Sequence, residues 1–344
     1  MTCVLSFRDV SCQFDNQRVV DAVSFDVAPG EIVCLLGPSG CGKTTSLRLA
    51  GGMETPDSGE ILIAGETVST PRHVVPPEKR NIGFLFQDYA LFPHLTVLEN
   101  ICFGIRHLAE KQRLARARDL LAEVSMTAFE TSLPDTLSGG EQQRAALARA
   151  MAPEPALLLM DEPFSSLDQQ LRDQMRDLTM RLLKRTGAAG LIVTHDAADA
   201  LRMADRVAVQ RAGRLEQIGT PESIYAAPKD IGVARMFGEV NTLCAGDVTT
   251  DTLVPVGGAT PQNLAADDVI GVRPVDIANA AAGPAYAVSA RLVEQRHVGV
   301  GWLCDYEMQP GHIWQALFRG SGAPTGDNFF VPADRLMLFK QSEQ

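Results

Sequence analysis

Apolar runs alternate with helical patterns from residue 1 to about residue 237 of this 344-residue chain. Three runs are apolar at every position, as buried strands covered on both faces are: residues 32–36, 157–160 and 191–193. Residues 169–185 repeat leucine and methionine at helical spacing and are followed by Gly187, a typical helix C-terminus. This alternation predicts an α/β domain.

Two further regions differ from this pattern. Residues 96–149 are mostly helical in pattern, and the basic run 111–118 within them predicts a solvated helix face. From residue 246 onward, helical periodicity fades and short apolar runs are separated by Gly and Pro, which predicts a small β-barrel. Its expected strands are residues 269–273, 286–293 and 302–306. We therefore expect domains at 1–240 and 241–344, with a helical subdomain at about 88–152.

Composition narrows the function classes. The net charge of −11, from 31 Lys+Arg and 42 Asp+Glu, argues against nucleic acid as the main partner. No apolar run reaches the roughly 18 residues of a membrane-spanning helix, and the N-terminus does not resemble a signal peptide. Seven cysteines without a Cys-x-x-Cys pair favour free thiols in a reducing cytosol.

A phosphate-binding loop follows the first buried run. The sequence Gly37-Pro38-Ser39-Gly40-Cys41-Gly42-Lys43-Thr44 matches G-x-x-x-x-G-K-[ST] between a strand and a helix that begins near Thr45. Glycines let backbone N–H groups turn toward phosphate oxygens, Lys43 neutralises phosphate charge, and the Thr44 hydroxyl can ligate Mg²⁺. We expect Cys41 to be a small tolerated residue rather than a redox switch.

Two acidic residues end the second buried run. Asp161 is placed to reach Mg²⁺, and Glu162 is our candidate for the general base that activates the attacking water. Behind a phosphate loop, this pair predicts nucleoside triphosphate hydrolysis.

A second glycine turn opens another helix at Ser138-Gly139-Gly140-Glu141. Ser138 and Glu141 have the spacing of a capping box, and the two glycines leave backbone N–H groups accessible to an anion. Because the phosphate loop already has a helix of its own, this second site suggests a nucleotide shared with another subunit.

Three further residues are weaker candidates. His195 follows the third buried run and is placed to touch a γ-phosphate. Gln87, after the apolar run 82–86, can offer its amide oxygen to Mg²⁺ or to the water, and Phe14 can stack on adenine. Taken alone, residues of these types in such positions are more often ordinary structural residues than site residues.

These motifs, in this order, resemble the ATPase subunits of ABC transporters, specifically the bacterial importer type with a C-terminal TOBE domain. The resemblance covers nearly the whole chain: Walker A at 37–44, Q-loop at 86–88, signature at 137–141, Walker B at 157–162, D-loop at 166–168 and H-loop at His195. It implies a P-loop NTPase (ABC ATPase) domain followed by a small all-β, OB-like domain.

The family also implies an assembly. Two copies would sandwich two ATPs, each between one Walker A loop and the other copy's signature, with Asp168 joining the two sites. Glu162 would act as the base and His195 would orient the γ-phosphate. A membrane permease would dock near residues 87–94, supplied by an extracytoplasmic solute-binding protein. The chain would then be peripheral, at the cytoplasmic face of the inner membrane.

Three positions depart from the family pattern. Glu141 stands where Gln is usual, Phe14 where a larger aromatic residue is usual, and Val275 where Glu is usual in the motif at 271–276. We expect the first to preserve capping, the second to loosen base selectivity, and the third to weaken any regulatory role.

The solute is expected to be ferric iron, from residues 142–147 and 161–168. Polyamine, favoured by residues 219–221 and 237–241, is the alternative, with thiamine or another small solute also open. Two other function classes are alternatives. A non-transport ABC ATPase acting on DNA or ribosomes is disfavoured by the acidic charge and by the absence of a long coiled-coil pattern. A regulatory switch through the C-terminal domain can coexist with import.

Overall fold

The computed structural model describes residues 3–247, 253–257, 265–309, 312–319, 324 and 326–340. These fall into two compact units, 1–222 and 223–344. The division lies before the expected boundary at 240/241.

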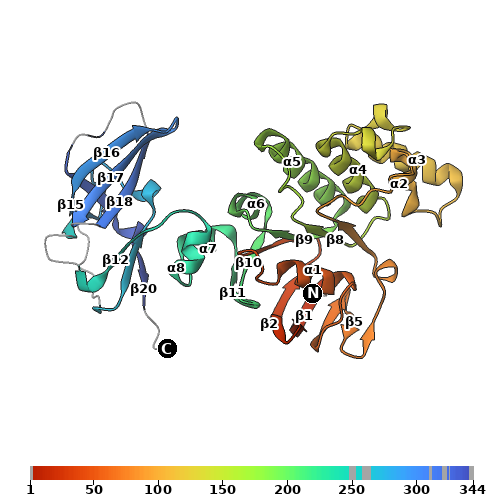
Figure 1. Cartoon of the computed structure of the whole chain (residues 1–344), viewed down its shortest axis with the longest axis horizontal. Coiled ribbons are helices and arrows are strands. Elements are labelled where there is room, and N and C mark those ends of the chain that lie inside the picture. Colours follow the sequence, from red (N-terminus) through yellow and green to blue (C-terminus); the bar gives the residue numbers. More distant parts are fainter. Residues whose placement is uncertain are drawn as a thin grey trace. The chain divides into compact units, whose positions relative to one another are not determined.

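The N-terminal unit is built on a six-stranded sheet (Figure 1). Its order is β11 (Arg214–Gly219), β10 (Arg206–Arg211), β3 (Ile32–Leu36), β9 (Ala189–Thr194), β8 (Leu157–Asp161) and β7 (Ile82–Leu85). All neighbours are parallel except the β10–β11 hairpin. Every residue of β3, β8 and β9 is buried, which explains their uninterrupted apolar sequences.

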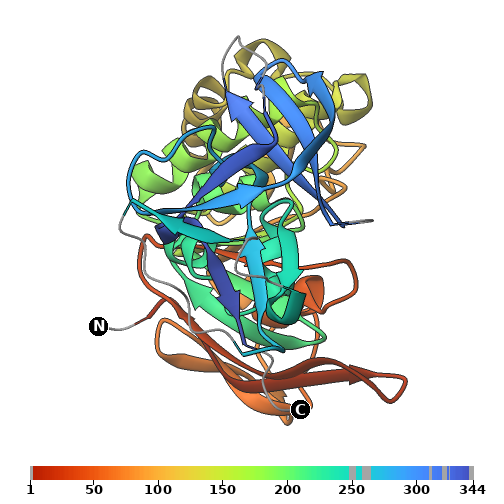
Figure 2. The same cartoon turned by 90° about the vertical axis from the view of Figure 1, so that its left-hand side faces the viewer.

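A second, antiparallel sheet has the order β2 (Gln17–Val27), β1 (Leu5–Phe14), β4 (Ser58–Ile63), β5 (Glu66–Thr70) and β6 (His73–Val74). Figure 2 shows the long β1–β2 hairpin in red along one side of the unit. Sequence analysis did not separate this sheet from the α/β core. Register shifts in β1 after Phe7, and left-handed backbone at Asp9 and Ala22, break the two-residue alternation that marks a strand.

Helix α1 (Lys43–Gly51) packs against β8 and β9 on one side and against β2 on the other, so it lies between the two sheets. Helices α2 (Val97–Phe103), α3 (Glu110–Glu123) and α4 (Gly139–Met151) gather on one side of the parallel sheet in Figure 1 and fill the expected helical subdomain. Helix α5 (Gln169–Thr186) ends at Gly187 in a left-handed conformation, as predicted. Helix α6 (Ala197–Met203) follows β9, and α7 (Pro221–Ala226) follows β11.

The C-terminal unit contains α8 (Ile231–Met236) and three small antiparallel sheets. Their orders are β12 (Asn241–Cys244), β14 (Val269–Val272), β20 (Met337–Phe339); β13 (Val254–Val256), β15 (Ala285–Ser289), β19 (Asn328–Pro332); and β16 (Arg291–His297), β17 (Gly301–Gln309), β18 (His312–Arg319). This is the expected small all-β domain. The expected single strand at 286–293 is wrong in detail: Ala290, whose N–H donates to the Asp327 carbonyl over 2.7 Å, separates β15 from β16.

The contacts of Arg273 explain where the boundary between the two units lies. Its buried guanidinium stacks on the Tyr225 ring, 4.1 Å from the centroid, and donates to the carbonyls of Ala234 and Tyr225. These contacts fix Tyr225 and α8 to the β-sheets. Residues 223–240 therefore belong to the C-terminal unit, although their helical pattern resembles that of the first.

Candidate nucleotide site

The loop from Gly37 to Thr44 connects β3 to α1 and depends on two of its glycines. A Cβ at Gly37 would lie 2.1 Å from the Gln210 carbonyl oxygen, and one at Gly42 would lie 2.1 Å from the Val19 carbonyl oxygen. Gly42 is also left-handed, with φ of 100°. The loop therefore presses against β10 and β2 and leaves Pro38, Ser39 and Gly40 exposed.

Lys43 is buried and its Nζ donates to the Gly37 and Pro38 carbonyls over 2.8 and 2.9 Å. These are neutral acceptors, so the ammonium charge faces no carboxylate in these contacts and is available to a phosphate. Cys41 lies beneath the loop, where burial raises the pKa of its thiol although Lys43 opposes this. A raised pKa means less thiolate, in agreement with the expectation of a small packing residue.

Two of the three residues proposed for Mg²⁺ are in contact. Thr44 Oγ1 donates to Asp161 Oδ1 over 3.0 Å, between the start of α1 and the end of β8. Burial raises the pKa of Asp161, and the hydrogen bond from Thr44 opposes that rise. A hydroxyl and a carboxylate oxygen beside a glycine-lined loop form a donor set that fits Mg²⁺ held together with phosphate oxygens.

Glu162 and His195 also meet. His195 Nδ1 lies 3.0 Å from Glu162 Oε2, because β8 and β9 are parallel neighbours whose carboxyl ends lie side by side. Glu162 has a left-handed backbone, φ 44°, and its N–H donates to the Val193 carbonyl over 2.9 Å. Such backbone strain in a non-glycine residue is concentrated at functional sites.

Helix α5 anchors the loop that carries His195, and the sequence pattern predicted the helix but not these contacts. Arg172 pairs with Asp196 over 2.7 Å, and Arg176 forms a buried ion pair with Asp199 of α6. Asp199 in turn accepts a hydrogen bond from Thr194, the residue before the histidine. The arginines lie on the polar side of the α5 pattern, where a sequence gives no sign of a buried partner.

Gln87 and Phe14 have less defined surroundings. Gln87 follows β7, the strand beside β8, and its side chain is exposed near the Asp161 end of the sheet. Phe14 is 43% exposed at the end of β1, in the hairpin whose other strand contributes Val19 behind Gly42. Both positions allow the expected roles without fixing them.

The signature segment has the predicted capping box. Glu141 N–H donates to Ser138 Oγ over 3.4 Å, and Ser138 N–H donates to Glu141 Oε2 over 2.8 Å. The Ser138 hydroxyl also donates to Glu141 Oε2 over 2.7 Å, and this bond, together with that from the Ser138 N–H, lowers the pKa of Glu141. A Cβ on Gly139 would meet nothing within 4 Å, so the first turn of α4 is open.

Asp168 has a local role in addition to the expected one. Its side chain accepts the Leu171 N–H over 3.0 Å and caps α5. Among the described residues, no hydrogen bond joins Ser138, Gly139, Gly140 or Asp168 to the phosphate loop. One copy therefore contains a loop with its acidic residues and, separately, a second helix start whose first turn is open.

Gln210 on β10 is a residue that sequence analysis missed. Its side chain is completely buried, and neither its oxygen nor its nitrogen has a hydrogen-bond partner among the residues that the structure describes. Its Nε2 would be 3.0 Å from a Cβ on Gly42, so an unsatisfied amide lies directly behind the phosphate loop. A polar residue inside an apolar strand was the only available sequence signal.

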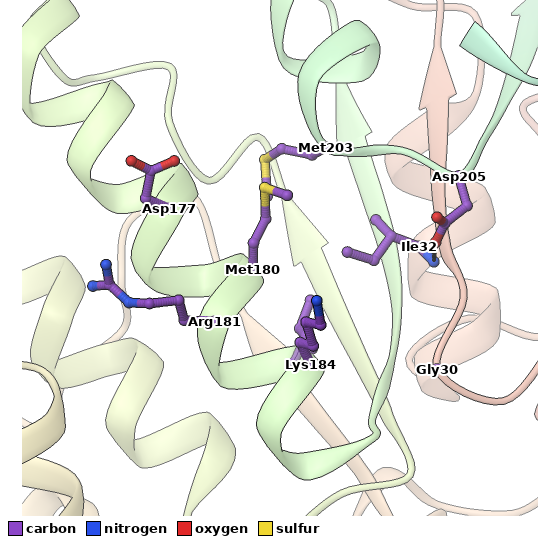
Figure 3. Close-up of a pocket in the computed structure, with 9 residues that line it drawn as sticks. Gly30, Ile32, Asp177, Met180, Arg181, Lys184, Met203 and Asp205 are labelled. Carbon is purple, nitrogen blue, oxygen red and sulfur yellow. Dashed lines mark hydrogen bonds between the residues drawn. The ribbon is translucent and has the colours of Figure 1, made fainter.

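Two of the cavities in the described part of the chain lie away from the phosphate loop. One of about 580 Å³ is at the opposite end of the parallel strands, lined by Ile32 and by Asp177, Met180 and Lys184 of α5 (Figure 3). None of the predicted site residues lines it. The other, of about 500 Å³, is an apolar groove beside the Q-loop, lined by residues that include Phe84, Phe86, Phe92, Phe103 and Arg149.

Comparison with known proteins agrees with this geometry. The family model described as "ABC transporter" matches residues 20–165. A spermidine/putrescine import ATP-binding protein of Mesoplasma florum is 36% identical, over 91% of this chain and 90% of that relative. A sulfate/thiosulfate import ATP-binding protein of Bordetella parapertussis is 42% identical, over 97% and 98%. A spermidine/putrescine import ATP-binding protein of Lawsonia intracellularis is 46% identical, over 70% of this chain and 65% of that protein.

Solved structures show the same N-terminal fold. The cbiO1 protein of Clostridium perfringens, part of an ABC transporter complex, has a TM-score of 0.60 at 25% identity and covers 66% of this chain and 92% of its own. A dimeric ATP-binding cassette bound to ADP and Pi has a TM-score of 0.56 at 27% identity, covering 63% and 98%.

Proposed function

Because this chain belongs to the ATP-binding subunits of ABC importers, and is therefore an ATPase, we propose that two copies of it bind two ATPs between them and drive a separate membrane permease. The proposal rests on four motif residues that lie in pairwise contact at the carboxyl end of the parallel strands. Thr44 contacts Asp161, and His195 contacts Glu162, each over 3.0 Å.

The residue roles follow from this arrangement. Lys43 and the loop N–H groups bind phosphates, and Gln87 with Thr44 and Asp161 would hold Mg²⁺, which supplies neutralisation of phosphate charge. Glu162 accepts a proton from the attacking water, and His195 holds Glu162 and the water in position. The strained backbone of Glu162 fixes where that carboxylate points.

The second half of each site would come from the other copy. Ser138, Gly139 and Gly140 lie at the start of α4, where the first turn is open, and a helix N-terminus favours an anion. The dimeric cassette bound to ADP and Pi supports this arrangement. Asp168, at the start of α5, would lie across the dimer interface.

The apolar groove beside the Q-loop would receive the permease. Its aromatic lining from Phe84, Phe86, Phe92 and Phe103 suits an apolar segment, and it adjoins the expected docking residues 87–94. Among the described residues, no helix is long and apolar enough to cross a membrane. We propose that the chain sits peripherally at the cytoplasmic face of the inner membrane, below a permease fed by a solute-binding protein.

For the solute we propose a polyamine. The relatives reported above are named for spermidine/putrescine or for sulfate/thiosulfate, and none of them is named for iron, so the ferric-iron expectation has no support among them. Residues 219–221 and 237–241 favoured the polyamine branch from sequence. Sulfate is a second candidate, because the 42% identity to the Bordetella protein extends over 97% of this chain.

Uptake by cells tests this proposal. A host strain lacking this chain would be complemented with the wild type or with Glu162→Gln, and uptake of labelled spermidine, sulfate and ferric iron would be measured in parallel. We expect the wild type alone to restore spermidine uptake. Restoration of sulfate or iron uptake instead would reassign the solute, and no change in any solute would refute an importer of these three classes.

A further inference from the structure

Tyr89 connects the Q-loop to the segment that follows the catalytic glutamate. This buried tyrosine lies two residues after Gln87, and its hydroxyl is 2.6 Å from Ser166 Oγ in the D-loop. A hydrogen bond between two side chains 77 residues apart ties the docking segment to the turn after Walker B.

The backbone of Tyr89 is held from another direction. Tyr89 and Ala90 are both left-handed, with φ of 61° and 46°, and this conformation turns their carbonyls toward Arg149. The Arg149 guanidinium donates to the Tyr89 carbonyl over 2.9 Å and to the Ala90 carbonyl over 2.6 Å. Arg149 lies in the last turn of α4, the helix whose first turn is the signature.

Gln143 joins α4 to the segment that follows Glu162. This completely buried residue of α4 donates from Nε2 to the Pro163 carbonyl, one residue after Glu162. Three segments are thus bonded pairwise. Arg149 joins the docking segment to α4, Gln143 joins α4 to the turn after Glu162, and Ser166 joins that turn to Tyr89 of the docking segment.

We propose that Tyr89 is a positioning residue for ATP hydrolysis, acting through Ser166 on the turn that sets the Glu162 carboxylate. This inference rests on the function proposed above. Ser166 is four residues after Glu162, and Ser165 Oγ donates to the Glu162 carbonyl over 3.0 Å, so the whole turn is one hydrogen-bonded unit. Since Glu162 is left-handed, its orientation depends on bonds made by this turn rather than on backbone preference.

The proposal extends to the docking surface. Ala90, Phe92 and Arg149 line the apolar groove. A permease segment bound there would therefore contact both the docking segment and α4. Tyr89 would then pass a change in the docking segment to Glu162 within the same copy.

A double-mutant cycle on the purified full chain tests the link between the hydroxyls. Tyr89→Phe and Ser166→Ala each remove one hydroxyl, and hydrolysis of Mg·ATP is measured for both, for the double variant and for the wild type. We expect each single variant to lower kcat about fivefold, with the KM for ATP changed less than twofold, because one neutral hydrogen bond is lost and the phosphate loop is untouched. The double variant should be no slower than the single ones.

Two further variants separate positioning from general damage. Ser166→Thr keeps a hydroxyl and should keep kcat within about twofold of the wild type, and Tyr306→Phe removes a buried hydroxyl from the C-terminal unit and should leave hydrolysis unchanged. Three results would overturn the proposal. They are effects on kcat that multiply in the double variant, an unchanged kcat in Tyr89→Phe, or a rise in the KM for ATP as large as the fall in kcat. Failure of the wild type to hydrolyse ATP would instead refute the proposed function, and the inference would fall with it.

Discussion

Three constraints act together on Glu162. Its backbone is left-handed, its N–H is bound to the neighbouring strand at Val193, and its carboxylate contacts His195. A carboxylate held this rigidly can keep one orientation toward a water molecule. The alternative, a glutamate that merely ends a strand, would need none of these contacts.

Changing Glu162 to Gln removes the base and keeps the shape. We expect ATP binding to stay within a few-fold of the wild type, while turnover falls by about 100-fold or more, because general-base catalysis contributes on that scale. The nucleotide-bound dimer should then accumulate. Phosphate release and size-exclusion chromatography with ATP measure both effects, and rapid hydrolysis by this variant would eliminate Glu162 as the base.

The unsatisfied amide of Gln210 predicts a stabilising substitution. Gln210→Met keeps the approximate side-chain volume and removes two buried polar atoms without partners, so we expect the free energy of unfolding to rise by about 1 kcal/mol or more. Gln143→Met is the matched control: Gln143 does bond the Pro163 carbonyl, and its loss should destabilise the chain. Urea denaturation measures the free energy of unfolding of both variants. A change of the same sign in the two variants would contradict this account.

The sequence was sufficient to find residues whose role depends on close neighbours in the chain. Ser138 and Glu141 form the predicted capping box because both partners lie within one helical turn. The sequence pattern did not indicate the buried amide of Gln210, the ion pair of Arg176 or the hydrogen bond of Tyr89 to Ser166, because each depends on segments that are distant in sequence. A polar residue in an apolar strand, or an arginine on a helix, carries no sign of which distant atom it meets.

At the scale of elements, α5 and α6 hold the histidine loop through one buried ion pair. Arg176 and Asp199 are 2% and 3% exposed, and burial raises the pKa of Asp199 while Arg176 lowers it. Removing one partner of a buried pair leaves a charge without compensation, which costs more than the pair itself contributes.

Arg176→Met should therefore destabilise the chain by about 3–5 kcal/mol at neutral pH. Without Arg176, the folded-state pKa of Asp199 rises further above its unfolded value, so the native state binds the proton more readily. Stability then falls as pH rises, and the deficit should be smaller at acidic pH than at pH 7. Urea midpoints across this range test the sign, and a deficit that grows on acidification would refute the role of Asp199.

The first turn of α4 gives a second prediction at this scale. Ser138→Arg fills the open end of the helix and removes the cap, which costs the helix about 1 kcal/mol. We expect each copy still to bind ATP, because the phosphate loop is on a different helix, and turnover to be blocked. Equilibrium nucleotide binding measures the first property, and phosphate release measures the second. Turnover that survives in this variant would contradict the shared-site arrangement.

Elements with one dominant pattern were predictable, and those with mixed patterns were not. The buried strands β3, β8 and β9 and helix α5 were confirmed because each keeps one period along its length. The antiparallel sheet was missed because bulges in β1 shift the register, and the strand expected at 286–293 is interrupted at Ala290. Local backbone irregularity, rather than composition, limited the prediction.

For the whole molecule, the boundary between the two compact units differs from the boundary that the composition suggests. Composition changes near residues 238–246, whereas the compact units divide between Glu222 and Ser223. Strand β12 pairs with β14, and Arg273 bonds the carbonyls of Tyr225 and Ala234. Residues 223–245 therefore depend on partners that lie after residue 268.

Two truncations distinguish these boundaries. A chain of residues 1–222 keeps both sheets of the N-terminal unit complete, since β11 ends at Gly219, and we expect it to fold and to bind ATP within about threefold of the full chain, as an independent domain should. A chain of residues 1–245 should bind ATP equally well, but its last segment has lost Arg273 and β14 and should be cleaved quickly by trypsin at Arg235. In the full chain the same site should be protected. Protection of Arg235 in the 1–245 chain, or an unfolded 1–222 chain, would place the boundary after α8 instead.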